Sequence, residues 1–193
     1  VLEKNEAQSV KGIWILSSIL AGQGYVYAEP DYLGLGESSG RHPYQLKEPY
    51  GTAVVDMLRA TRQFALKTQE KTEEGEDLVD FYVNGQLFLA GYSEGGYATM
   101  AVHQIIERDY KDEFNITASF PCAGAYSMSG IMVDLMLDKE PYGQPFYFPY
   151  VLFSYIESYP ELGTAEFCGG CHQFAHKPRQ FPDGFRGRLQ QAS

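Results

Sequence analysis

The chain has 193 residues, the size of one ordinary domain, and is 44% hydrophobic and 21% charged. These values predict a folded core rather than a disordered chain. The formal net charge of −10, from 15 Lys and Arg against 25 Asp and Glu, argues against a nucleic-acid binder, which needs basic patches to neutralise phosphates. No apolar run reaches the roughly 18 residues of a membrane-spanning helix. Aromatic residues make up 15%, which predicts aromatic surface or lid material as well as core.

The two ends of the sequence bear on whether it is part of a longer protein, and its cysteines bear on the cellular compartment. The first residues carry neither an initiator Met nor a signal-peptide pattern, and the run from Arg186 to Ser193 gives no stop signal for a final element. We therefore expect the sequence to be part of a longer protein. Three cysteines, Cys122, Cys168 and Cys171, are too few for a disulfide scaffold and do not indicate a compartment.

Hydrophobic periodicity predicts alternating strands and helices up to residue 120. Helices are expected over residues 10–21, 52–67 and 95–110, and strands over 24–30, 86–90 and 116–120. A Gly/Ser loop is expected over 31–40, and a charged loop over 71–77. The second helix has an apolar stripe of Val54, Val55, Leu58, Thr61, Phe64 and Ala65. This order predicts an α/β fold, with a mostly parallel sheet, right-handed crossovers and helices on both faces.

The composition of the sequence changes after Gly130. A short helix is expected over 131–137, and residues 142–159 are rich in Tyr and Phe. No clear strand follows residue 125. The aromatic block has two interpretations: core packed against the sheet, or a lid that covers an active site and contacts acyl chains. We accordingly divide the chain into a partial α/β core over residues 1–130 and a lid-like or cap-like segment with an uncertain tail over 131–193.

The sharpest functional signal is the run Gly91-Tyr92-Ser93-Glu94-Gly95-Gly96. An apolar strand leads into it and a helix leads out, the setting in which a serine sits on a tight, strained turn with its hydroxyl exposed. Side chains at the flanking glycines would collide with the neighbouring strand and helix. The helix N-terminus favours developing negative charge. The pattern predicts Ser93 as a catalytic nucleophile, the alternative being an incidental glycine-rich turn.

A serine nucleophile needs donors for the negative charge on the carbonyl oxygen. The backbone N–H of Glu94, directly after Ser93, is the first expected donor. Asp31 follows the first predicted strand and is well placed to supply the second donor of this oxyanion hole. The alternative for Asp31 is a turn-forming residue after Pro30.

Two runs together resemble a known family. The segment from Ala28 to Tyr44, A-E-P-D-Y-L-G-L-G-E-S-S-G-R-H-P-Y, followed by L-A-G-Y-S-E-G-G, resembles secretory lipases and bacterial esterase–lipase relatives of the α/β-hydrolase superfamily (lipase A-like). The resemblance covers roughly residues 10 to 160. It implies an α/β-hydrolase fold, Ser93 as nucleophile, Asp31 in the oxyanion hole and a helical lid after Gly130. It also implies a secreted or cell-envelope protein.

The proton-transferring partners are harder to place. The superfamily order is nucleophile, then acid, then His. His103 lies two turns into the helix after Ser93, so we expect it to pack or to face solvent. His172 and His176 follow the aromatic block without the strands that the fold needs. We therefore expect the acid and the base beyond residue 193, with a shortened triad using His172 or His176 as the alternative. Without a base the isolated 193 residues would be nearly inert.

Two other patterns that contain histidine have several possible interpretations. We expect His42, in Arg41-His42-Pro43-Tyr44, to anchor its loop by hydrogen bonds, the alternative being a substrate contact. The run Cys168-Gly-Gly-Cys171-His172 matches a c-type haem attachment string. Together with His176 it also matches a Cys2His2 zinc cluster. A redox pair, a disulfide and coincidence are the other interpretations, and coincidence is favoured, so no cofactor and no metal site is predicted.

Together these patterns predict a serine hydrolase that cleaves carboxylic esters, a lipase or esterase acting through an acyl-enzyme on Ser93. Expected partners are a small-molecule ester or a lipid, with transient contact to a lipid interface through the lid. No nucleic acid and no obligate protein partner is expected. The alternatives are a serine peptidase of the same superfamily, a non-catalytic relative or remnant, and a metal or haem carrier through Cys168 and Cys171.

Overall fold

The computed structural model describes residues 15–73, 81–138 and 142–159. The chain divides into two compact units: Val1–Pro30 with Asp56–Gly85, and Asp31–Val55 with Gln86–Ser193. The predicted boundary at residue 130, between the α/β core and the lid-like segment, is not one of these divisions and stays a prediction. Within the described ranges, no helix combines the length and the apolar character that crossing a membrane requires.

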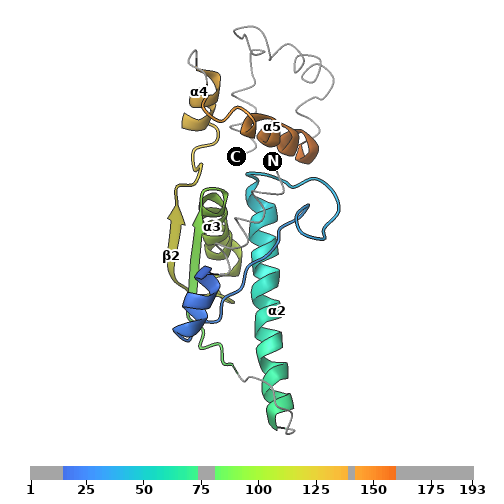
Figure 1. The fold of residues 1–193 in the computed structure, drawn as a ribbon, viewed down its shortest axis with the longest axis vertical. Helices are drawn as coiled ribbons and strands as arrows, with labels where there is room; N and C mark the ends of the chain where they lie inside the picture. Colours follow the sequence, from blue (N-terminus) through green and yellow to red (C-terminus); the bar gives the residue numbers. More distant parts are fainter. Residues whose placement is uncertain (1–14, 74–80, 139–141, 160–193) are drawn as a thin grey trace. The chain divides into compact units, whose positions relative to one another are not determined.

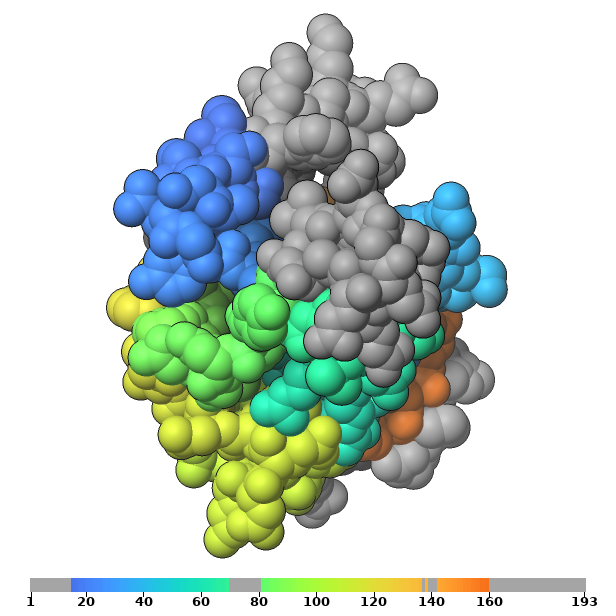
Figure 2. Space-filling model, turned by 90° about the horizontal axis from the view of Figure 1, so that it is seen from below, coloured from blue at the N-terminus to red at the C-terminus, as the bar shows by residue number. Residues whose placement is uncertain are grey.

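A strand–helix–strand unit forms the centre of the second unit. Strands β1 (Leu87–Tyr92) and β2 (Ile116–Cys122) run parallel, with Leu87 opposite Ile116 and Tyr92 opposite Cys122. Helix α3 (Glu94–Ile105) packs against both strands and continues into a short π-helix, η1 (Ile106–Tyr110) (Figure 1). On the face drawn in Figure 2, the residues of this unit form a continuous surface coloured green to yellow. The predicted parallel pairing and crossover helix are confirmed for these elements.

The sequence of α3 explains why it packs where it does. Its buried face includes Ala98, Ala101, Val102 and Ile105, which recur at the i, i+3, i+4, i+7 spacing of one helical stripe. The helix also lies very close to the start of α2 (Lys47–Glu73), because a Cβ atom at Gly51 would collide with the side chain of Ile105. Gly51 thus leaves room for the side chain of Ile105 between the two helices.

Strand β2 is longer than predicted. It was expected to end before Pro121, but it continues through Pro121, opposite Gly91, to Cys122. A proline removes a donor N–H and is tolerated in a strand where that N–H would not pair. The sheet of the described residues has two strands. The fold is therefore a mixed α/β arrangement with a small parallel sheet, and the full sheet of an α/β-hydrolase is not seen in the described part.

Helix α2 confirms the predicted helix over 52–67 and extends it at both ends, so the predicted loop over 71–77 begins inside the helix. Residues 74–77 lie outside the described ranges. Val54, Val55 and Ala65 are buried as the stripe predicted, but the side chain of Phe64 is 63% exposed, so the stripe was wrong there. Phe64 lies at the stripe's edge, and its ring contacts Phe81 instead, with centroids 5.8 Å apart.

The N-terminal part departs most from the prediction. Residues 15–22 are helical as predicted, and residues 10–14 lie outside the described ranges. The predicted strand over 24–30 is wrong: these residues form no strand with the other described residues, and Tyr25 and Val26 are 52% and 46% exposed. Residues with high β-propensity form a strand only where a neighbouring strand covers and pairs with them. The predicted loop over 31–40 is confirmed, with Gly34 and Gly36 at φ values of 73° and 59°.

Two helices follow the sheet. Helix α4 (Ile131–Leu137) matches the prediction, and α5 (Tyr147–Ser158) forms within the predicted aromatic block. Both contribute to one apolar cluster, made of Leu46, Met128, Val133, Met136, Val151 and Tyr155. The aromatic block is partly buried and partly exposed: Tyr155 is 3% exposed in the cluster, whereas Phe146 and Tyr150 are 54% and 50% exposed. Its role as a lid stays a prediction. No strand follows β2 in the described ranges, as predicted.

The close approach of α3 and β2 gives a testable prediction. A Cβ atom at Gly96 would collide with the backbone carbonyl of Cys122, whereas a Cβ atom at Gly95 meets nothing within 4 Å. Gly96→Ala should therefore lower the free energy of unfolding by about 1–3 kcal/mol. Gly95→Ala, the matched control, should be neutral or slightly stabilising. Urea unfolding of both variants measures the difference, and equal stability of the two would contradict this packing.

Candidate active site

Ser93 lies on the turn between β1 and α3. Its backbone has φ 57° and ψ −115°, a region that non-glycine residues rarely adopt and that costs about 1–3 kcal/mol. Neighbouring backbone groups hold it there: the N–H of Ser93 donates to the carbonyl of Cys122 at 2.9 Å, and the N–H of Tyr97 donates to the carbonyl of Ser93 at 3.1 Å. The turn after β1 is thus strained and fixed to the end of β2.

The glycines around Ser93 differ in what they allow. A Cβ atom at Gly91 would collide with the carbonyl of Gly95, and one at Gly96 with the carbonyl of Cys122. Gly95 faces open space, so the expectation that a side chain on each flanking glycine would collide is wrong for Gly95. The tight contact on the helix side falls one residue later, because Gly96 is the position of α3 that lies against the end of β2.

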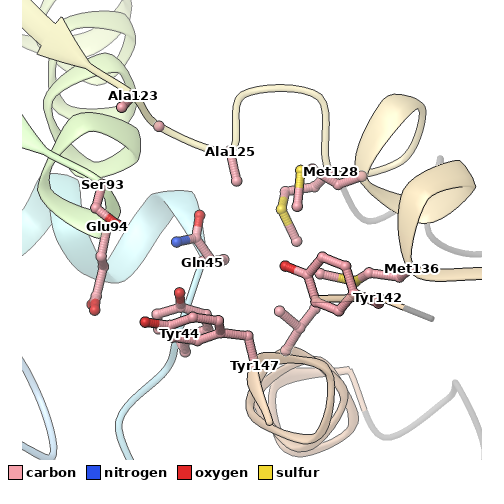
Figure 3. Close-up of a pocket in the computed structure, with 13 residues that line it drawn as sticks. Tyr44, Gln45, Ser93, Glu94, Ala123, Ala125, Met128, Met136, Tyr142 and Tyr147 are labelled. Carbon is pink, nitrogen blue, oxygen red and sulfur yellow. The ribbon is translucent and has the colours of Figure 1, made fainter. Parts of the chain in front are cut away.

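A pocket of about 220 Å³ opens beside Ser93. Figure 3 shows Ser93 and Glu94 on one side, Met128 and Met136 on the other, and Gln45 between them. Apolar and aromatic side chains predominate among the residues that line it: Tyr44, Gln45, Ser93, Glu94, Ala123, Gly124, Ala125, Met128, Met132, Met136, Tyr142, Tyr147 and Val151. Such a pocket suits an apolar group held next to a hydroxyl.

Glu94 follows Ser93 and carries a carboxylate that is bound from two sides. Its Oε1 atom lies 2.6 Å from Nε2 of His42 and accepts a hydrogen bond of 2.7 Å from the hydroxyl of Tyr50. Tyr50 is buried, and burial together with the negative charge of Glu94 raises its pKa, so the hydroxyl remains a donor. The N–H of Glu94 lies in the first turn of α3, where backbone donors have no partner within the helix.

His42 connects the loop over 31–44 to Glu94. Its side chain is only 9% exposed, and its Nδ1 atom lies 2.8 Å from the carbonyl oxygen of Leu33. Burial opposes the charged imidazolium, but the hydrogen bonds to Glu94 and Leu33 and the charge of Glu94 outweigh it, so the pKa of His42 is raised. His42 is not among the residues that line the pocket. Its contacts are those of a loop anchor.

Asp31 begins the same loop. Its carboxylate packs against Gly36, where a Cβ atom would lie 2.5 Å from Oδ2 of Asp31. Gly36 thus leaves room for the Asp31 side chain inside the turn. Asp31 is not one of the residues lining the pocket, in contrast to Ser93 and Glu94. Its predicted contribution to an oxyanion hole stays a prediction.

The sequence analysis missed Gln45, which lines the pocket. Gln45 has φ 59° and is 2% exposed. Two tyrosines hold this backbone: the N–H of Gln45 donates to the hydroxyl of Tyr50 at 3.1 Å, and its carbonyl accepts from the hydroxyl of Tyr155 at 3.3 Å. Its Oε1 atom has no hydrogen-bond partner among the described residues. Nothing in the sequence marks a left-handed glutamine, because long-range contacts impose that conformation.

Tyr44, the neighbour of Gln45, also lines the pocket, and the sequence analysis assigned it no role. Burial raises the pKa of Tyr44 to about 12, although a hydrogen bond from Gln45 opposes that shift. Its ring stacks on that of Tyr147 of α5, with centroids 6.0 Å apart. Tyr44 therefore stays neutral at physiological pH and links the loop to the helix that follows the sheet.

The remaining histidines and cysteines lie elsewhere. Nδ1 of His103, on α3, is 2.8 Å from the hydroxyl oxygen of Ser119 on β2, and His103 does not line the pocket. Cys168, Cys171, His172 and His176 lie outside the described residues, so the haem, zinc, disulfide and shortened-triad alternatives stay untested. Within the described part, no group of three or more His, Cys, Asp or Glu could hold a metal ion.

Comparison with known proteins finds similar solved structures. No family model and no curated protein matches the chain. A solved structure of a candidate hydrolase from Legionella pneumophila does, with 29% identity, a TM-score of 0.58 and coverage of 71% of this chain. Two variants of LipA, a rice cell wall degrading esterase from Xanthomonas oryzae, match with 28% and 25% identity, TM-scores of 0.56 and 0.64, and coverage of 69% and 98%. The chain is similar to hydrolase and esterase structures.

These similarities confirm the predicted resemblance to esterase–lipase relatives of the α/β-hydrolase type. The chain spans only 34%, 33% and 45% of the lengths of those three proteins, in the same order. It thus corresponds to less than half of each matched structure.

The strain at Ser93 gives a second prediction. Glycine adopts positive φ without the steric penalty of a side chain. Ser93→Gly should therefore be about 1–2 kcal/mol more stable than Ser93→Ala, although both remove the hydroxyl. The free energies of unfolding in urea make this comparison. Equal stability would show that the turn is not strained in solution.

Proposed function

We propose that Ser93 is the nucleophile of a carboxylic ester hydrolase, a lipase or esterase, within the complete protein. The observation that carries the proposal is the strained turn that holds Ser93 between β1 and α3, beside a largely apolar pocket. A fixed hydroxyl at a helix N-terminus next to room for an acyl or alcohol group is what acyl transfer needs. The similarity to hydrolase and esterase structures supports the same reaction class.

The proposed chemistry proceeds in two halves. The hydroxyl oxygen of Ser93 attacks the ester carbonyl carbon while a base takes its proton, and the carbonyl oxygen becomes an oxyanion. The N–H groups of Glu94 and Asp31 stabilise that charge. The alcohol leaves with the proton from the base, and water then releases the acid from the acyl-enzyme. We propose that a histidine base and its acidic partner come from parts of the complete protein other than the described residues.

The substrate proposed here is a small ester or a lipid. The pocket offers methionine, tyrosine and valine side chains to an apolar chain, and methionine adapts to irregular shapes. Exposed aromatic side chains on and just before α5, among them Phe146 and Tyr150, favour a lid that meets a lipid surface transiently. Neither nucleic acid nor an obligate protein partner is part of the proposal.

A labelling experiment tests the nucleophile. A fluorophosphonate probe should modify Ser93 in the complete protein. Ser93→Ala should abolish the labelling and lower kcat for hydrolysis of p-nitrophenyl esters by roughly 10³-fold or more. Ser158→Ala, which removes an exposed hydroxyl at the end of α5, is the matched control and should leave both unchanged. Labelling that persists in Ser93→Ala, mapped by peptide mass spectrometry, would overturn the proposal.

The reaction class is tested by substrate choice. With p-nitrophenyl acyl esters and peptide anilides at equal concentrations, we expect kcat/KM to favour the esters by at least tenfold. Faster cleavage of the anilides would instead indicate a peptidase of the same superfamily. If neither substrate turns over and the probe does not label Ser93, the complete protein is a non-catalytic relative.

A further inference from the structure

Each ring nitrogen of His42 lies within hydrogen-bonding distance of an acceptor oxygen. Nδ1 lies 2.8 Å from the carbonyl oxygen of Leu33, and Nε2 lies 2.6 Å from Oε1 of Glu94. A backbone carbonyl carries no proton. The hydroxyl of Tyr50 lies 3.2 Å from Nε2 of His42, but it donates its proton to Oε1 of Glu94 at the shorter distance of 2.7 Å. A neutral imidazole has one N–H and could satisfy only one of these contacts. The geometry therefore fits a doubly protonated, positively charged His42.

Among the described residues, Glu94 supplies the carboxylate that faces the ring of His42. The other titratable groups facing the ring are three tyrosines: Tyr32, Tyr44 and Tyr50, with ring centroids 6.3, 6.1 and 5.8 Å away. The neighbouring Arg41 points elsewhere, pairing with Glu157 at 3.1 Å and lying over the ring of Phe153. The side chain of His42 is 9% exposed and that of Glu94 33%, so solvent screens the pair only in part.

We propose that His42 is a positioning residue that, as an imidazolium, holds the loop carrying Asp31 against Glu94. This inference rests on the proposed function, because Glu94 and Asp31 matter there as the oxyanion donors. The connection runs from the loop backbone at Leu33, through the two N–H groups of His42, to the carboxylate of Glu94. Tyr50 of α2 supports that carboxylate from a second side. His42 itself does not touch the reacting atoms.

The sign of the pH dependence follows from which form makes both contacts. The charged form of His42 is present below its pKa, which lies above the usual value of 6.5. As pH rises through that raised pKa, the ring loses one proton and one of its two hydrogen bonds. The loop and Glu94 then separate, and the two oxyanion donors lose their mutual position. Activity should accordingly fall on the alkaline side.

A pH profile of the complete protein tests this coupling. Ester hydrolysis by the unaltered protein should show a descending alkaline limb in kcat. His42→Gln should lack that limb and have a kcat about tenfold lower at neutral pH, with KM changed little, because a misplaced donor weakens the transition state more than substrate binding. His103→Gln removes another half-buried imidazole outside the pocket and is the matched control. It should keep the alkaline limb, and a limb that persists in His42→Gln would overturn the inference.

A nuclear magnetic resonance titration tests the charge without any turnover. The ¹⁵N signals of His42 should show both nitrogens protonated at pH 6.5, and Glu94→Gln should shift the titration midpoint of His42 to lower pH. In Glu94→Asp, which keeps the charge, the midpoint should move back towards that of the unaltered protein. A neutral His42 at pH 6.5 would overturn the inference even if Ser93 is labelled. Failure of the proposed function would instead appear as labelling that survives Ser93→Ala, whatever His42 does.

Discussion

Backbone atoms of β1, α3 and β2 meet around Ser93 at distances that leave no room for side chains at Gly91 and Gly96. This approach constrains the turn, because backbone carbonyls cannot rotate away as side chains can. It also explains how Ser93 keeps its unfavourable dihedral angles: the N–H of Ser93 is bound by the end of β2, and its carbonyl by α3. The pocket beside Ser93 has a defined shape on this side because the turn cannot relax.

Behind this apolar pocket lies a polar network of a different character. The carboxylate of Glu94 is shared by His42 and Tyr50, and the hydroxyl of Tyr50 also accepts from the backbone of Gln45. Partly buried ion pairs contribute little net stability but hold their members in one arrangement when every polar group is satisfied. The network therefore connects the loop over 31–44 to α3, the two segments that carry the proposed oxyanion donors.

The elements that the sequence predicted well are those whose signal is local. Helix α3 follows from its apolar spacing, and the turn at Ser93 follows from glycine, serine and glycine between an apolar strand and a helix. The errors concern features that depend on neighbours. Residues 24–30 have the composition of a strand but no pairing partner in the described residues, and Phe64 fits the stripe of α2 yet is exposed. The crowded glycine after Ser93 is Gly96 and not Gly95, because the position of β2 decides it.

The sequence by itself determined an α/β arrangement with a parallel strand pair, the position of Ser93 on a strand-to-helix turn and the short helix after Gly130. Each has a local signal in the sequence: hydrophobic periodicity, glycine spacing, or the strand–helix–strand order that implies a parallel pair. Only the tertiary structure brought His42, Tyr50 and Glu94 together, because 52 positions separate His42 from Glu94 in the sequence. It alone also placed Gln45 in a left-handed conformation at the pocket. Hydrogen bonds between distant segments leave no periodic trace in a sequence, so which side chains share a proton is decided only when the chain has folded.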